Sequence, residues 1–453
     1  MIGTIVQMSA LLAAGLLLLS LAWYRPRWVI FFTLSVAATL DLFQIGIGGV
    51  NLGVNLYIDD AACVLAMGTG LLMLMRYHTK FPRDAVPCLA LMVLIALSFG
   101  RGVSPFGLNA AGNSSRNLFC FVAPALAIML LRPAFRLDAG RLARWLGWAG
   151  LCLSAVALLR WRGVLPIPGE SGQNDFRDVV RSLIADDAFI VGLAFIAAIW
   201  LPLVARRSAW WWVGAVTLGA VTFALQHRSV WVATAAGLVW LGLRSLRRLS
   251  PLRWLAVGAA VCVGLGVIVV AIPQVLESTG MIVTTNVQEV ESPYSTWAWR
   301  VAGYEEATDR LFSSQPVDIL IGPPAGWAAD LIREHFASTI IHSRYVSTLA
   351  FYGIVGSTAL LLWFGMLAKR IGWPTRSPRG RPARDHAGTI LLEALLLSEL
   401  VYMVPYTGGL PEGAVLGLIW VAAKQSNISI GAERVAIARY QFHRSSKLAA
   451  QAS

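Results

Sequence analysis

Long apolar stretches that are nearly free of charge recur along the whole sequence, and they constrain the fold more than any other feature. Hydrophobic residues make up 57% of the 453 residues and charged residues only 13%. A helix of roughly 20 apolar residues crosses the hydrocarbon layer because its backbone groups bond internally. Leu, Val, Ala and Gly dominate instead of the alternating pattern of a membrane barrel. The sequence predicts an all-α polytopic integral membrane protein with about 12 to 13 transmembrane helices, near residues 3–24, 28–45, 61–75, 86–100, 118–131, 145–159, 188–205, 209–226, 229–243, 254–273, 346–368, 389–406 and 411–423.

The connections between these stretches alternate in charge. One alternate set holds 26 of the 37 Lys and Arg residues and only four of the 24 acidic residues. By the positive-inside rule this set is cytoplasmic, and the opposite set faces the periplasm or the exterior. The net charge of +13 is thereby explained by membrane topology and contact with membrane lipids, so no nucleic-acid partner is expected.

The chain is predicted to form a single membrane domain over residues 1–453, with an external loop at 160–187, a large periplasmic loop at 273–345 and a basic cytoplasmic tail at 424–453. Within the large loop, residues 296–312 and 325–341 carry helical periodicity. The stripe of the first segment contains Trp297, Val301, Tyr304, Thr308 and Leu311. A loop of this length with its own secondary structure is usually functional.

Three ionisable positions on the predicted external side have two interpretations each. Arg228 follows His227 where two apolar spans meet, so it is either an arginine that reaches the membrane interface or a phosphate-binding arginine in an outward cavity. Arg300 lies one helical turn before Tyr304 and is either solvated or part of the same cavity. His342 comes just before a span and is either an interfacial side chain or a functional one.

Arginine and histidine together favour a particular substrate. A lipid-linked sugar diphosphate presents two phosphates at the external headgroup plane, where the arginine fork matches phosphate oxygens. A histidine with a near-neutral pKa takes the proton from an acceptor hydroxyl or orients that hydroxyl. No carboxylate pair at glycosidase or metal spacing stands out, so neither a metal nor a cofactor is expected.

Three segments carry a resemblance to a known family: HRSVWVATAAGLVWL, WAWRVAGYEEATDRLFSSQPVDILIGPPAGW and HSRYVSTLAFYGIVG. Their order and spacing resemble the C-terminal signature region of the bacterial O-antigen ligase and polysaccharide repeat-unit polymerase superfamily. The resemblance covers residues 225–356. It implies a metal-independent, inverting glycosyltransferase whose leaving group is a lipid diphosphate.

The resemblance also implies roles for individual residues. It makes Arg228 and Arg300 diphosphate-binding residues and His342 the catalytic residue that handles the acceptor hydroxyl. Arg116 and Arg181 resemble further external arginines of the diphosphate site. Supporting positions are Tyr304, Arg344 and Tyr345, and Gly353 and Gly356 look structural. The sequence departs from the family pattern at Ser343, where Asn is usual, at the additional Arg344, and at His227, where Ser is frequent.

The predicted function is polymerisation of the repeat units of an exopolysaccharide or O-antigen from a polyprenyl-diphosphate-linked glycan donor onto a glycan acceptor. A chain-length regulator and a flippase are further expected partners. Two alternatives stay open. The first is an O-antigen ligase that transfers glycan to the lipid A core. The second is a transporter or flippase of lipid-linked sugars, for which intramembrane carboxylates such as Asp41, Glu393 and Glu399 are the relevant candidates.

Overall fold

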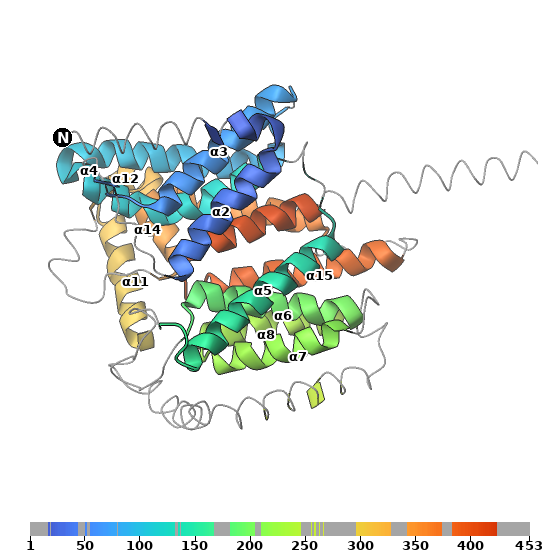
Figure 1. The fold of residues 1–453 in the computed structure, drawn as a ribbon. Coiled ribbons are helices and arrows are strands. Elements are labelled where there is room, and N and C mark those ends of the chain that lie inside the picture. Colours follow the sequence, from blue (N-terminus) through green and yellow to red (C-terminus); the bar gives the residue numbers. More distant parts are fainter. Residues whose placement is uncertain are drawn as a thin grey trace, which may run out of the picture.

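The computed structural model shows a bundle of long helices, with shorter helices gathered at one end (Figure 1). Apart from a two-residue antiparallel pair, β1 (Val50–Asn51) with β2 (Asn55–Leu56), every regular element among the described residues is helical. The predicted class, an all-α membrane protein, is confirmed. The structure describes residues 17, 18, 20–43, 50, 51, 55–78, 80–131, 135, 137–166, 182–203, 210–245, 255, 258, 259, 262, 266, 296–327, 342–373 and 383–423.

Most of the helices match the predicted apolar stretches to within a few residues. Among the described residues, five helical segments are long and apolar enough to cross a membrane, and three shorter apolar helices accompany them. The predicted spans 3–24 and 254–273 lie largely outside the described residues. The helices are α2 (Pro26–Leu42), α3 (Ile58–Arg76), α4 (Val86–Leu130), α5 (Ala139–Trp161), α6 (Ala185–Leu203), α7 (Trp210–Ala224), α8 (Arg228–Ser245), α11 (Thr296–Phe312), α12 (Pro316–Ile321), α14 (Arg344–Ile371), α15 (Ala383–Tyr402) and Leu410–Ala423, with a short 3-10 turn η1 (Arg83–Ala85).

Helix α4 combines two predicted spans that the sequence pattern separates. The expected connection, residues 101–117, is helical except at Gly107, where φ is 81° and the chain bends sharply. Asp84, just before α4, pairs with Arg370 at the C-terminal end of α14. In the second half of α4, Phe121 lies instead under the guanidinium of Arg344, at the other end of α14. The two halves therefore run in opposite directions, as two consecutive spans do.

Helix α6 is the central element of the bundle. It is apolar on all sides and almost entirely buried, which is typical of a helix enclosed by other helices. Glycines permit its close contacts, because a Cβ at Gly192 would lie 2.2 Å from the Thr234 hydroxyl of α8. Close approach of backbones through small residues is how helices associate when lipid removes the hydrophobic drive between them.

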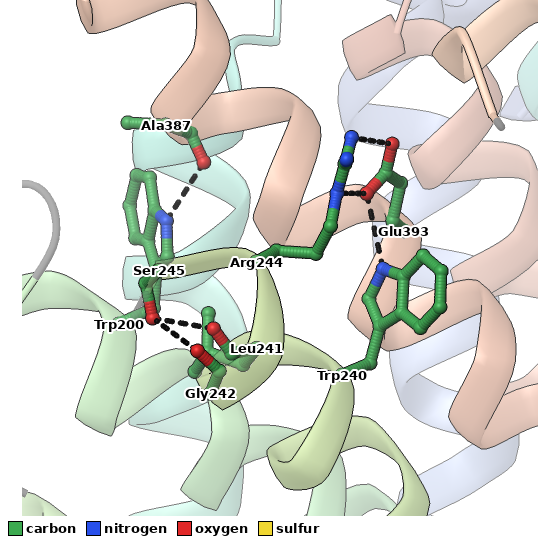
Figure 2. Close-up of polar contacts among 8 residues, drawn as sticks. All are labelled: Trp200, Trp240, Leu241, Gly242, Arg244, Ser245, Ala387 and Glu393. Carbon is green, nitrogen blue, oxygen red and sulfur yellow. Dashed lines mark hydrogen bonds and ion pairs between the residues drawn. The ribbon is translucent and has the colours of Figure 1, made fainter. Parts of the chain in front are cut away.

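A buried ion pair joins α8 to α15 at the end of the bundle away from Arg344. Arg244 donates from Nε and Nη2 to Glu393 at 2.9 and 3.1 Å, and Trp240 Nε1 donates to the same carboxylate at 3.0 Å (Figure 2). Nearby, Trp200 Nε1 donates to the carbonyl of Ala387 at 2.8 Å. Glu393 is fully buried, yet both of its oxygens are satisfied. This intramembrane carboxylate therefore has a structural role.

Removal of the arginine from this pair is expected to destabilise the bundle. Arg244→Ala leaves a buried carboxylate without its counter-ion, which costs about 3 kcal/mol or more of unfolding free energy. The temperature of unfolding of the purified protein in detergent measures the effect. Arg141→Ala is the matched control, because Arg141 pairs with Asp138 at the surface with both side chains more than half exposed. Its loss is expected to cost less than about 1 kcal/mol, and equal shifts in the two variants would contradict the prediction.

Candidate functional site

Helix α11 lies across one end of the bundle, at a steep angle to the long helices and at the left of Figure 1. Its bounds agree with the predicted amphipathic segment 296–312. Ala307 and Leu311 are buried. Tyr304 and Arg300 lie one and two turns earlier on the same face, because residues 300, 304 and 307 have the i, i+4 and i+7 spacing of one helix face. Arg300 therefore faces the bundle. The second predicted loop helix, 325–341, lies mostly outside the described residues.

Helix α12 and the turn that follows it are hydrogen-bonded to α4 and so connect α11 to the membrane helices. Arg101 of α4 donates to Asp318 at 2.5 Å and to the carbonyl of Gly322 at 2.7 Å. The Ser98 hydroxyl donates to the carbonyl of Pro323 at 3.0 Å, and the Ala325 amide donates to the carbonyl of Ser98 at 2.9 Å. The Gly- and Pro-rich residues 322–326, which follow α12, are thus anchored to α4 by hydrogen bonds.

A loop at residues 403–409 contacts both α11 and the N-terminal end of α14. The Arg344 amide donates to the carbonyls of Met403 and Tyr406 at 3.0 and 3.1 Å, and its Nη2 donates to the carbonyl of Gly408 at 2.8 Å. Glu412 accepts from the Gly409 amide at 2.6 Å. Arg344 is 1% exposed and its guanidinium lies 4.3 Å from the centre of the Phe121 ring. Arg344, a predicted supporting residue, therefore fixes the position of this loop through hydrogen bonds from its backbone and its side chain.

Tyr406 on this loop lies between two of the predicted site residues. The guanidinium carbon of Arg300 is 5.2 Å from the centre of the Tyr406 ring, within cation–π range, and Arg300 Nη1 donates to the carbonyl of Pro405 at 3.4 Å. The His342 ring meets the same tyrosine edge-on at a centroid distance of 6.3 Å. Arg300 and His342, far apart in sequence, are brought to one place by the 403–409 loop.

An aromatic stack continues from Tyr406 into the core of the bundle. Tyr406 stacks on Tyr402 at 5.1 Å, and Tyr402 stacks on Phe189 of α6 at 4.0 Å. The Tyr402 hydroxyl donates to Asp186 at 2.6 Å. Each of these rings is fixed by its neighbours, so the position of Tyr406 is set by the central helix of the fold.

The charge of Arg300 acts on His342. Partial burial, together with the nearby Arg300 guanidinium, lowers the pKa of His342 to about 4, because both disfavour a second positive charge. The imidazole is therefore neutral at neutral pH and able to accept a proton. Burial also raises the pKa of Tyr304, an effect opposed in part by the Arg300 charge, so its hydroxyl stays protonated as a donor.

Polar atoms of Arg300 and Tyr304 remain open to a ligand. The Arg300 Nε and the Tyr304 hydroxyl are buried, and neither meets hydrogen-bond geometry with any residue in the part of the chain that the structure describes. A buried donor without an acceptor is costly, so such donors at a site usually mark the place of water or a ligand. Both groups donate, which suits an anionic, oxygen-rich ligand.

Removing the charge of Arg300 is expected to raise the pKa of His342 from about 4 toward its ordinary value. The change is Arg300→Gln, and the measurement is NMR titration of isotope-labelled histidine in the full-length protein, with His342→Gln used to assign the signal. Arg310→Gln is the control on the same helix, because Arg310 pairs with Glu306 on a partly exposed face. An unchanged His342 titration in Arg300→Gln would show that the two side chains do not interact.

The other predicted diphosphate residues lie in different surroundings. Arg228 begins α8, next to the buried His227, whose Nε2 lies 2.9 Å from the carbonyl of Leu183. Arg228 therefore lies at the end of the bundle where α6 begins. Arg116 is held by Asp60 at 3.0 Å and lies over the Tyr57 ring at 4.2 Å. Arg181 lies outside the described residues.

Tyr345 and the predicted structural glycines contact the protein itself. The Tyr345 hydroxyl donates to the carbonyl of Leu400 at 3.0 Å and so ties α14 to α15. Gly353 interrupts α14 with a φ of 64°, where a Cβ would lie 2.6 Å from the carbonyl oxygens of Ile319 and Leu320. At Gly356 a Cβ would lie 2.5 Å from the Tyr352 side chain.

Sequence reasoning missed Tyr406 and the loop that carries it. Tyr406 lies at the end of a predicted span, in the run VPYTGGLPEG, and nothing in its spacing separates it from an interfacial aromatic residue. The two consecutive glycines and two prolines of that run signal a turn between helices. They do not reveal that the turn meets α11, which is more than a hundred residues earlier in the chain.

Comparison with known proteins gives no assignment for this geometry. No protein-family model matches the chain, and no curated protein sequence matches it significantly.

Proposed function

We propose that this membrane protein is a glycosyltransferase that moves an oligosaccharide from a polyprenyl diphosphate carrier to a hydroxyl of a second glycan. The reaction takes place at the periplasmic face of a bacterial inner membrane and polymerises repeat units. One observation carries the proposal: Arg300 and His342 meet around Tyr406 at one end of the bundle. An arginine fork and a neutral imidazole side by side suit the transfer of a sugar from a phosphate.

The proposed chemistry needs no metal ion and no cofactor. The acceptor oxygen forms the new bond to the anomeric carbon while the bond from that carbon to the phosphate oxygen breaks. The polyprenyl diphosphate leaves with the bonding electron pair, and the acceptor proton passes to His342. Arg300 stabilises the negative charge that develops on the leaving oxygen, assisted by the Tyr304 hydroxyl. These donors are fixed before the reaction, so little reorganisation is needed as charge develops.

Binding of the diphosphate is expected to strengthen the base. A histidine with a pKa of about 4 is always neutral at pH 7 but is a weak proton acceptor. Two phosphates beside Arg300 would offset the positive field that lowers the pKa of His342. The acid limb of kcat/KM, which reports the free enzyme, is therefore expected near pH 4, and the acid limb of kcat, which reports the complex, at a higher pH.

The direct test is a transfer assay with the purified full-length protein in phospholipid vesicles. The substrate is a polyprenyl-diphosphate-linked oligosaccharide, and the products are longer lipid-linked glycans together with free polyprenyl diphosphate. Arg300→Lys is expected to reduce the rate, because a point charge lacks the fork that matches phosphate oxygens. Movement of the lipid-linked sugar across the vesicle without new glycosidic bonds would support the transporter alternative and refute the enzyme.

The choice between polymerase and ligase depends on the acceptor. The departures at Ser343 and Arg344 alter the acceptor side of the resemblance, which favours a polymerase with its own repeat unit over a common lipid A core. Deletion of the gene followed by analysis of surface glycan separates the two. Single repeat units left on carrier or core support the polymerase, whereas long polymer accumulating on the carrier supports the ligase.

A further inference from the structure

Two buried glutamates on α15 differ completely in their surroundings. Glu393 and Glu399 are both 0% exposed. Glu393 accepts hydrogen bonds from Arg244 and Trp240 (Figure 2), whereas neither carboxyl oxygen of Glu399 has a hydrogen-bond partner within the part of the chain that the structure describes. Of these two glutamates on one helix, Glu393 thus has an arginine partner, whereas Glu399 has no hydrogen-bond partner among the described residues.

The groups that face Glu399 are themselves mostly acidic. Helix α6 contributes Asp186, and helix Leu410–Ala423 contributes Glu412, whose second oxygen is also buried without a partner among the described residues. A Cβ on Gly409 would lie 3.4 Å from Asp186 Oδ2 and 3.8 Å from Glu412 Oε2, which places these two carboxyls around one loop residue. The acidic groups that act on Glu399 therefore come from α6 and from the last helix, and they are not close enough to one another to hold a metal ion together.

None of the described basic and phenolic groups at this end of the bundle gives a hydrogen bond to Glu399. On α14, Arg344 donates to the carbonyl of Gly408 and Tyr345 donates to the carbonyl of Leu400. On α15, Tyr402 donates to Asp186, and on α5, Arg160 donates to the carbonyls of Ser182 and Leu42. On α8, Arg228 is the first residue of the helix.

An ionised carboxylate that accepts no hydrogen bond from the protein is strongly disfavoured inside a helix bundle, and neighbouring carboxylates add repulsion. We infer that Glu399 is a proton-binding site, which holds its proton at neutral pH and so remains a neutral carboxylic acid inside the bundle. The ligand is a proton and not a metal ion, because no three His, Cys, Asp or Glu side chains among the described residues are grouped to hold a metal. Intramembrane carboxyls of this kind are commonly functional.

The proton has a consequence for the candidate functional site. Glu412 accepts a hydrogen bond from the Gly409 amide. Asp186 accepts one from the hydroxyl of Tyr402, whose ring stacks on Tyr406. Loss of the proton from Glu399 would place a negative charge beside both groups and weaken the arrangement of the 403–409 loop. Proton binding at Glu399 therefore couples pH to the position of Tyr406, and through it to Arg300 and His342. This inference stands independently of the proposed glycosyl transfer.

Infrared spectroscopy of the purified full-length protein tests the proton directly. Protonated carboxyl groups give a carbonyl stretching band that is separate from that of ionised carboxylates and that shifts on exchange into D2O. At neutral pH the protein is expected to show this band, Glu399→Gln to lose a component of it, and Glu393→Gln to keep it. Absence of the band from the parent protein, or an undiminished band in Glu399→Gln, would overturn the inference. A band that disappears when sodium is added would identify a cation site instead and overturn it as well.

Thermal unfolding provides a second readout that needs no spectral assignment. A carboxyl that keeps its proton when folded and loses it when unfolded lowers stability as pH rises, because the folded state then binds more protons. Glu399→Gln removes this dependence, so its Tm at neutral pH is expected to be no lower than that of the parent and to fall less toward alkaline pH. Glu393→Gln is expected to lower Tm, because it breaks an ion pair. Glu399→Leu, which also carries no charge, serves if the glutamine variant fails to insert, and a large Tm loss in both Glu399 variants would contradict the inference.

Discussion

Replacing His342 by alanine is expected to reduce the rate of glycosyl transfer by about 10²- to 10⁴-fold, the usual contribution of a general base. The reason is specific to its position. The imidazole is partly buried beside Arg300 and Tyr406, it is neutral at neutral pH, and alanine supplies no proton acceptor in its place. The measurement is the rate at which the vesicle-reconstituted protein lengthens a polyprenyl-diphosphate-linked oligosaccharide.

The matched control for this prediction is another histidine. His78 lies in an exposed turn with a φ of 45°, a conformation that asparagine tolerates, so His78→Asn is expected to leave the rate unchanged. Both variants must keep the monodisperse elution and the Tm of the parent protein. A His342→Ala protein that is folded and fully active would remove histidine from the mechanism and leave the transporter alternative as the stronger one.

Replacing Gly353 by alanine is expected to give the largest loss of stability of any conservative change in α14. The residue has φ 64° and ψ −164°, a region open in practice only to glycine, and a new Cβ would lie 2.6 Å from two carbonyl oxygens and 2.7 Å from the Gly322 nitrogen. The neighbouring Gly322 has a φ of 82°, and a Cβ there would lie 2.1 Å from the Phe351 oxygen. The strain and the clash together are expected to cost about 3 kcal/mol or more.

Gly365 offers the control within the same helix. It is exposed, and a Cβ there would meet nothing within 4 Å. Gly365→Ala is therefore expected to be neutral or to stabilise by about 0.5 to 1 kcal/mol through the better helix propensity of alanine. Unfolding temperature in detergent gives both values. The 316–327 segment packs on Gly353 and follows α11 in the chain, so Gly353→Ala is also expected to reduce glycosyl transfer at temperatures where the bundle remains folded. A Gly353→Ala protein as stable as the parent would refute the close packing of Gly353 against Gly322.

The sequence predicted the membrane class and most helix positions because apolar length is a strong, local signal. It also predicted the bounds of α11, because the helical period of residues 296–312 is present whether or not the helix packs on anything. The separation of α4 into two spans was a partial success: residues 101–117 are helical, and only Gly107 makes the reversal. Hydropathy gives the presence of a span but not the conformation of the connection.

The candidate site was less accessible to sequence reasoning. Arg300, Tyr304, His342 and Arg344 were identified as candidates, and the structure brings all four to the same end of the bundle. The spatial relation of Arg228 to this group, and the roles of Arg116 and Arg181, stay predictions. Tyr406 was missed, and so was the contrast between Glu393 and Glu399, because neither residue type nor spacing tells which carboxyl meets an arginine.

The sequence by itself determined that the chain is a helical membrane protein, where its spans lie, and that an amphipathic helix stands outside them, because backbone satisfaction in lipid leaves few alternatives to a helix. Only the tertiary structure decided which ionisable side chains meet. The 403–409 loop brings Arg300 and His342 to one tyrosine, and the packing of α15 places Glu393 beside Arg244 but gives Glu399 no hydrogen-bond partner among the described residues. Such meetings depend on helix rotation and on contacts between segments distant in sequence, which a local pattern does not record.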